Sequence, residues 1–93
     1  MVDDTKFREL IEKYTPRHAN GKPHPAEFAR MLSVIPHRPF TKQRIYFWFK
    51  GKYKPDIRDM YQLYHGTRNG APHRFAREYL ILAGELLPEE LES

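Results

Sequence analysis

Prolines divide this chain into short segments, which limits the regular structure that it can form. Eight of the 93 residues are proline. Proline lacks an amide hydrogen and its ring fixes φ, so it can open a helix but interrupts one from inside. Pro16 and Pro36 are therefore expected to end regular structure. Pro25, Pro55 and Pro72 stand where helices can begin. A chain of this length is expected to form one small domain with a modest core.

Apolar side chains recur at the helical period in the segments between these prolines. The first such pattern, at i, i+3, i+4 and i+7, is formed by Phe7, Leu10, Ile11 and Tyr14. It predicts a helix over residues 4–14 with Asp4 or Thr5 as its N-cap. Similar patterns predict helices over residues 25–33, 41–50, 55–66 and from residue 72 onward. Since no segment shows the sustained alternation of a strand, the predicted fold is all-α, with five helices in a single domain over residues 1–93.

Two connections between these helices have a distinctive composition. Residues 17–25 contain Asn20, Gly21 and two prolines, which predicts an exposed loop. Residues 34–40 also contain two prolines and predict a stiff turn that carries His37 and Arg38. Arg38 is thereby expected to lie just before the helix over residues 41–50.

The positive charge of the chain is concentrated in its middle. The formal net charge is +4, and no Asp or Glu lies between Glu27 and Asp56. Seven basic residues fall in that interval: Arg30, Arg38, Lys42, Arg44, Lys50, Lys52 and Lys54. A positive face of this kind attracts and orients polyanions such as nucleic acids. The simpler alternative is a solvated basic surface without a partner.

Several classes of function are disfavoured by the composition. The chain has no cysteine, which excludes disulfides and thiolate metal sites and fits a reducing cytoplasm. The N-terminus lacks the pattern of a signal peptide, and no apolar run approaches the roughly 18 residues of a membrane span. The five histidines lack zinc-ligand spacing, and no catalytic arrangement or phosphate-binding loop is found. We therefore expect a soluble cytoplasmic binding protein rather than an enzyme, with no cofactor, metal, membrane or small-molecule substrate.

The helix predicted over residues 41–50 combines an apolar side with several cations and contains no acidic residue. The hydroxyl of Thr41 can cap its first turn, and Gly51 can adopt the left-handed conformation that ends a helix. Ile45 and Trp48 are spaced to face inward. The lysines, the glutamine and the arginine of its first turn are then expected to point outward.

The spacing of residues in this region resembles that of a known family. The first pattern is Phe28-Ala29-x-x-Leu32, and the second is Phe40-Thr41-x-Gln43-x-Ile45-x-x-Trp48-x-x-Gly51-Lys52-x-x-Pro55. Together they resemble the positioning helix and the recognition helix of the lambda-repressor-like family of phage repressors and Cro proteins. The chain departs from that family at Pro25, where a phosphate-binding glutamine is usual. It also departs in the turn, which is lengthened by residues 35–40.

The resemblance implies a helix-turn-helix fold in which residues 25–33 position the helix over residues 41–50 in the DNA major groove. It implies a sequence-specific double-stranded DNA-binding protein, such as a transcriptional repressor of a phage or mobile element acting at the bacterial nucleoid. The expected base contacts are Thr41, Lys42, Gln43 and Phe47. The expected contacts to the DNA backbone are Arg38, Arg44, Tyr46, Lys50, Lys52, Lys54 and Arg58.

The last helix offers a candidate surface for dimerisation. A single helix reads only a short half-site, so proteins of this plan usually bind palindromic sites as homodimers. The candidate dimer surface consists of Tyr79, Leu82 and Leu86. The alternative is that this apolar face closes the core over the first and fourth helices.

Two other functions stay open from the sequence. Tyr46, Phe47 and Tyr53 could form the aromatic patch of a protein-interaction module, such as an adaptor or an antitoxin. Exposed aromatic rings also stack on unpaired bases, so an RNA or single-strand binder is a further alternative.

Overall fold

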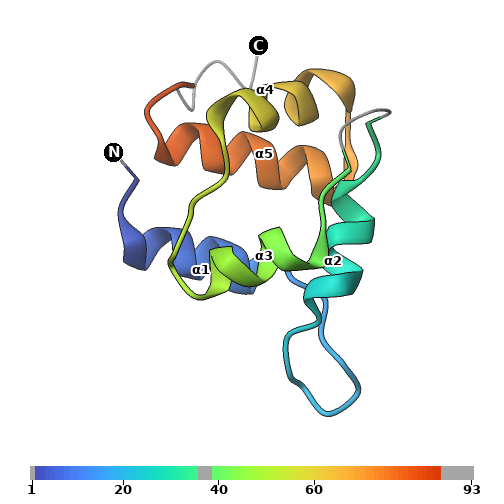
Figure 1. Cartoon of the computed structure of the whole chain (residues 1–93). Coiled ribbons are helices and arrows are strands. Elements are labelled where there is room, and N and C mark those ends of the chain that lie inside the picture. The colour runs from blue at the N-terminus through green and yellow to red at the C-terminus, as the bar shows by residue number, and fades with distance from the viewer. Residues whose placement is uncertain (1, 36–38, 87–93) are drawn as a thin grey trace.

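The computed structural model describes residues 2–35 and 39–86, and this part of the chain contains helices and no β-strand (Figure 1). The five helices are α1 (Asp4–Tyr14), α2 (Pro25–Leu32), α3 (Lys42–Phe49), α4 (Ile57–Gly66) and α5 (Gly70–Leu82). The prediction of an all-α fold with five helices is confirmed. None of the helices in the described part has the length and apolar character that a membrane crossing requires.

The predicted cap of α1 and the predicted starts of α4 and α5 differ from the structure. The N-cap of α1 is Asp3, whose carboxylate accepts hydrogen bonds from the amides of Thr5 at 2.8 Å and Lys6 at 3.1 Å. The prediction of Asp4 or Thr5 as the cap was wrong, because Asp3 is the residue with extended backbone directly before the first turn. Helix α4 begins at Ile57, after its N-cap Asp56, rather than at Pro55. Helix α5 begins at Gly70 rather than at Pro72. The first-turn amides of a helix have no partner within it, so a proline there removes no hydrogen bond.

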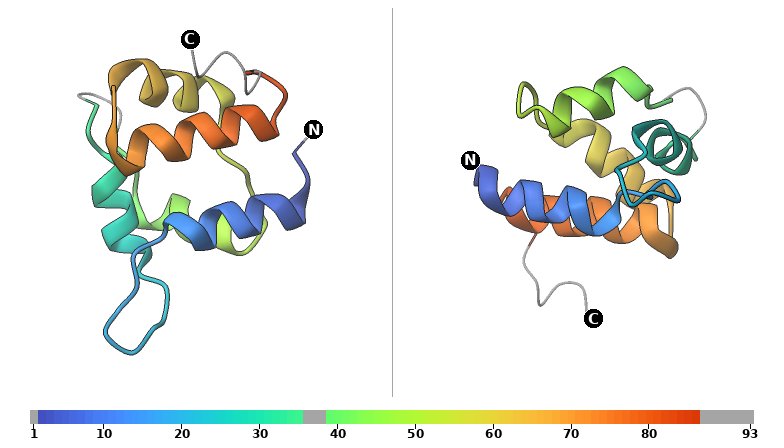
Figure 2. Two further views of the ribbon diagram at one scale, coloured as in Figure 1. Left: turned by 180° about the vertical axis from the view of Figure 1, so that it is seen from behind. Right: turned by 90° about the horizontal axis from the view of Figure 1, so that it is seen from below.

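Helix α5 is the central element of the packing. It packs against α1 on one side and α4 on the other, while α2 packs against α3. The right-hand view of Figure 2, from below, shows α1 and α5 together on one side of the molecule and α3 on the opposite side. The side chain of Phe75 on α5 is completely buried at the junction of these helices. Its ring centroid lies 5.2 Å from that of Phe28, 5.9 Å from that of Tyr14 and 6.2 Å from that of Trp48. One aromatic side chain therefore joins α5 to α1, α2 and α3.

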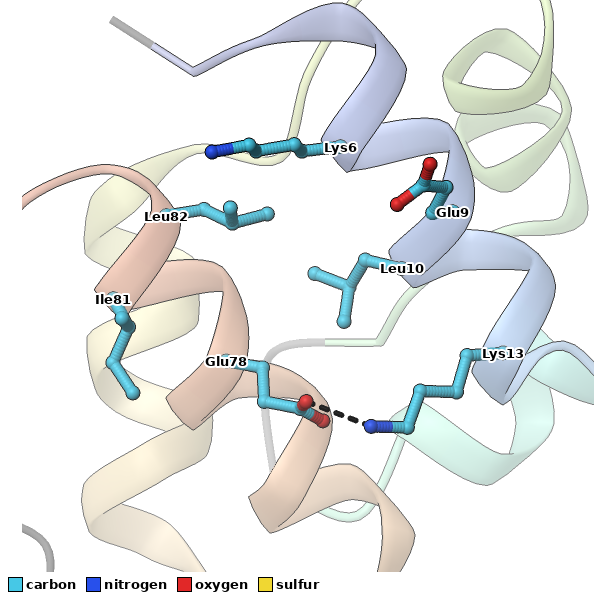
Figure 3. Close-up of a pocket in the computed structure, with 7 residues that line it drawn as sticks. All are labelled: Lys6, Glu9, Leu10, Lys13, Glu78, Ile81 and Leu82. Atoms are coloured by element: carbon cyan, nitrogen blue, oxygen red, sulfur yellow. Dashed lines mark hydrogen bonds and ion pairs between the residues drawn. The ribbon is translucent and has the colours of Figure 1, made fainter. Parts of the chain in front are cut away.

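Helices α1 and α5 are also joined at the surface. Lys13 and Glu78 form an ion pair of 2.8 Å (Figure 3). The Tyr14 hydroxyl donates a hydrogen bond to the same carboxylate. Burial raises the pKa of Glu78, but the hydrogen bonds from Lys13 and Tyr14 outweigh burial and hold this pKa below its usual value. The ion pair lies at one side of an open groove of about 410 Å³ between the two helices, with Leu10, Ile81 and Leu82 among its lining residues.

The predicted dimer surface is only partly available at the surface of the protein. Tyr79 is 2% exposed, and its ring meets that of Phe7 edge to face at 5.6 Å. Its hydroxyl donates a hydrogen bond of 2.9 Å to the backbone carbonyl of Pro55. The assignment of Tyr79 to a dimer surface was wrong, because the ring belongs to the core that α5 forms with α1. Leu82 and Leu86 are partly exposed and pack at the edge of the core.

Alkaline pH is expected to destabilise the fold through Tyr79. Burial, together with the charge of Asp56, raises the pKa of Tyr79 to about 12 from its ordinary value of 10.0. Because the unfolded chain releases this proton first, the stabilisation is complete below pH 10 and is lost as the pH rises towards 12.

Tyr79→Phe should therefore lose about 1 kcal/mol of unfolding free energy at neutral pH, where the hydrogen bond to Pro55 is intact. Urea unfolding at pH 7 and at pH 11 measures the difference between the variant and the parent protein. That difference should shrink or reverse at pH 11, because only the parent protein carries the Tyr79 hydroxyl, and each pH unit above the pKa of the unfolded chain costs it about 1.4 kcal/mol of stability. Equal losses of unfolding free energy in the two proteins between pH 7 and pH 11 would contradict the assignment of the alkaline destabilisation to Tyr79.

Candidate nucleic-acid interface

The sequence around α3 fixes both the ends and the orientation of this helix. The Thr41 hydroxyl accepts a hydrogen bond of 3.2 Å from the amide of Arg44, which caps the first turn. Gly51 follows the helix with φ of 72°, a left-handed conformation that glycine adopts without strain. Ile45 is completely buried and Trp48 is 4% exposed. These four positions behave as predicted, and the two apolar ones anchor α3 to the core.

The opposite side of α3 is turned to solvent. With 100° between successive residues, Gln43, Tyr46, Phe47 and Lys50 project on the side away from Ile45 and Trp48. All of the predicted base contacts except Phe47 are exposed, and Phe47 is half-buried. The described part of α3 thus presents amide, ammonium and aromatic groups on one face, without a carboxylate.

Three aromatic rings and two lysines form a continuous cluster at the C-terminal end of α3. We define this aromatic cluster as Tyr46, Phe47, Lys50, Lys52 and Tyr53. The ring of Phe47 lies 5.5 Å from that of Tyr53 and 6.4 Å from that of Tyr46. Lys50 lies over Tyr46 at 5.2 Å, and Lys52 lies over Phe47 at 5.0 Å. Tyr46 and Tyr53 are 46% and 57% exposed. The cluster therefore offers both cationic charge and ring edges to a partner.

Arg44 is held against α4. Its guanidinium forms an ion pair of 2.8 Å with Asp59, whose side chain is only 10% exposed, and lies 5.4 Å from the centre of the Phe40 ring. The pair fixes the N-terminal half of α3 relative to α4. The contact of Arg44 with a DNA phosphate stays a prediction. Asp59 was not foreseen, although its position four residues before the buried Leu63 places it on the inward side of α4.

The remaining predicted contacts to the DNA backbone lie in different surroundings. Lys54 forms an ion pair with Asp4 at the start of α1, and its side chain is 33% exposed. Arg58 is exposed in the first turn of α4. Arg38 and His37 lie outside the described residues. The structure therefore brings Lys50 and Lys52 together beside the exposed face of α3 and ties Arg44 and Lys54 to carboxylates.

A serine joins the end of α2 to the residue that precedes the cap of α3. The Ser33 hydroxyl donates to the carbonyl of Ala29 at 2.7 Å and accepts a hydrogen bond from the amide of Phe40 at 2.8 Å. These bonds join the two ends of the connection between α2 and α3. The sequence does not predict these hydrogen bonds, because no local pattern indicates a partner seven residues away.

The described residues contain no group of three or more His, Asp or Glu side chains that could hold a metal ion. Comparisons with protein-family models, with curated proteins and with solved structures found no match to this chain. The interpretation of the site therefore depends on its own geometry and charge.

Proposed function

We propose that this chain is a sequence-specific double-stranded DNA-binding protein that inserts α3 into the major groove. The observation that supports it most is the division of α3 into a buried apolar side and an exposed side with Lys42, Gln43 and Lys50. In this proposal α2 and α3 form a helix-turn-helix with a lengthened turn. The regulator would act as a repressor, such as that of a phage or mobile element, by occupying an operator in the bacterial cytoplasm.

The exposed side chains suit the chemistry of the groove. Gln43 can bind adenine through two hydrogen bonds, Lys42 can donate to the acceptors of guanine, and the Phe47 edge can lie on a thymine methyl group. The diameter of an α-helix with its side chains, about 10–12 Å, matches the width of the major groove. Eight helical residues span about 12 Å, which covers three or four base pairs along the duplex. Since so short a site gives limited discrimination, we expect a homodimer on a palindromic operator.

The distribution of ion pairs favours a phosphate-binding role for the lysines beside α3. Among the basic residues of the candidate interface, Arg44 and Lys54 form ion pairs, whereas Lys42, Lys50 and Lys52 have no carboxylate of the described residues within 4.0 Å. No carboxylate of the described residues therefore neutralises their charge. Lysines of this kind release counterions from DNA when they bind phosphates, which makes the affinity depend on salt.

The deciding experiment is selection of bound sequences from a library of random duplexes. Recovery of a palindrome would support sequence-specific binding and would give the half-site spacing, with centres about 34 Å apart for one helical turn. Equal recovery of all duplexes would refute the proposal. Competition with single-stranded DNA and structured RNA belongs in the same series, because preferential binding of either would support the single-strand alternative.

Lys52→Ala should weaken binding to selected and scrambled duplexes alike. Each lost phosphate contact should lower the slope of log affinity against log salt concentration by about one unit. Titration by fluorescence anisotropy at several salt concentrations measures this slope. Lys6→Ala is the matched control, since Lys6 is an exposed lysine of α1 that lines the groove towards α5. Equal slopes for the two variants would argue against phosphate binding beside α3.

A second candidate function is a protein-interaction module, and the exposure of Tyr46 and Tyr53 favours it. The lysines over the rings weigh against it, because the centres of protein interfaces are depleted of lysine. Tyr53→Ala distinguishes the two functions. The interaction module would be supported if the parent protein binds a protein partner in the presence of nuclease and high salt and the variant does not. Loss of duplex binding alone would support the DNA-binding protein.

A further inference from the structure

The connection between α1 and α2 is an ordered loop that projects from the body of the protein (Figures 1 and 2). We call residues 15–24 the basic loop. Its two sides are joined by a bridge between Arg17 and Pro23, and the amide of His18 donates to the carbonyl of Lys22 at 2.8 Å. At the tip, the amide of Gly21 donates to the carbonyl of His18 at 2.9 Å. The loop therefore has a defined shape although it is almost wholly exposed.

Side chains reinforce this shape. The imidazole rings of His18 and His24 stack with their centroids 3.8 Å apart, and the Arg17 guanidinium donates to the carbonyl of Gly21 at 2.8 Å. His24 also accepts a hydrogen bond from the amide of Glu27 and so caps α2. Because α2 packs against α3, the loop is connected firmly to the helix of the proposed interface.

The basic loop contributes charge but little to the core. Residues 17–23 are all exposed, and the loop contains Arg17 and Lys22 without any acidic residue. The Lys22 ammonium has no carboxylate within 4.0 Å in the described part of the chain. Ordering an exposed segment costs conformational entropy. Because this loop is ordered in the unbound protein, a partner that binds it does not have to order it. A preordered cationic projection is suited to a polyanion with a regular spacing of charges.

We propose that the basic loop is a second nucleic-acid contact, which binds phosphates of the duplex flanking the site occupied by α3. This inference rests on the proposed binding of double-stranded DNA by α3. In Figure 1, α4 lies at the top of the molecule, α3 lies below it, and the loop projects from the bottom, below α2. The loop contacts would carry no base preference, because phosphates are the same at every sequence. They would fix the register of α3 and lengthen the footprint of the protein.

Lys22→Ala tests the inference because its side chain has no role in holding the loop together. With a duplex selected from the random library, the variant should bind roughly fivefold to tenfold more weakly at 0.1 M salt, with a salt slope reduced by about one unit. Lys22→Glu should bind more weakly still. The preferred sequence should not change. Lys6→Ala, which removes the same charge from α1, should bind as the parent protein does.

Shortening the duplex shows where the loop binds. The effect of Lys22→Ala should vanish once the flanking base pairs are removed, while the effect of Gln43→Ala should persist on the shortened duplex. If the parent protein binds duplex DNA and Lys22→Ala matches it at every length and salt concentration, the loop contact is refuted and the role of α3 stands. If the parent protein binds no duplex DNA, both proposals fall.

Discussion

Phe75→Ala is expected to lower the free energy of unfolding by about 3–5 kcal/mol, a large part of the total stability of a domain this small. The side chain is completely buried, and its ring meets rings from α1, α2 and α3. Removing it would leave a cavity where four helices meet, and the surrounding side chains could fill that cavity only in part. The position of α3 should be affected as strongly as the total stability.

Urea unfolding followed by tryptophan fluorescence measures this loss directly. Trp48 is the only tryptophan and stacks on Phe75, so its emission reports on the site of the change. Tyr53→Ala is the control, because this ring is 57% exposed and its truncation should cost less than about 0.5 kcal/mol. If Phe75→Ala does not fold, Phe75→Leu should still fold with a loss of about 1–1.5 kcal/mol. Similar losses for Phe75→Ala and Tyr53→Ala would contradict the described core.

Gln43→Ala is expected to reduce discrimination between the selected operator and scrambled duplex by about tenfold or more. A bidentate contact between an amide and adenine is worth about 1–3 kcal/mol of discrimination, and the side chain of Gln43 is exposed on the outward face of α3. Affinity for scrambled duplex and the midpoint of urea unfolding should both stay unchanged. A repeated selection with the variant should lose its preference at one position of each half-site.

Gln62→Ala provides the matched comparison, since it makes the same chemical change on α4. It should leave the selected sequence unaltered. An unchanged preference in the Gln43 variant would remove this residue from the proposed base contacts. The proposal of duplex binding would then depend on the salt dependence that Lys52 is expected to produce.

Periodicity and capping residues predicted all five helices but not every boundary. The burial of Ile45 and Trp48 was predicted from their three-residue spacing. The role of Thr41 as the N-cap of α3 was predicted from its hydroxyl. The cap of α1 was assigned wrongly because residues 3–5 are all good capping residues. The inward placement of Tyr79 could not be distinguished from an exposed apolar face, because one helix does not indicate which neighbours cover it.

The contacts that position the candidate interface could not be predicted from the sequence. The pair of Arg44 and Asp59 joins residues 15 apart on two helices, and Lys54 reaches back to Asp4 on a third. Such pairs depend on the angles between helices, which local patterns do not specify. Charge counting names these basic residues as candidates but does not show which of them are paired with carboxylates within the protein.

The hydrogen bonds of Ser33 bear on how this protein could diverge. Because hydrogen bonds join Ser33 to Phe40 at the two ends of the connection between α2 and α3, we expect that the number of residues between them can change with little movement of either helix. Insertions and deletions would then accumulate in this segment at little cost to either neighbour. Homologues would share the two helices and differ in the gap that separates them, so a search based on fixed spacing would overlook them.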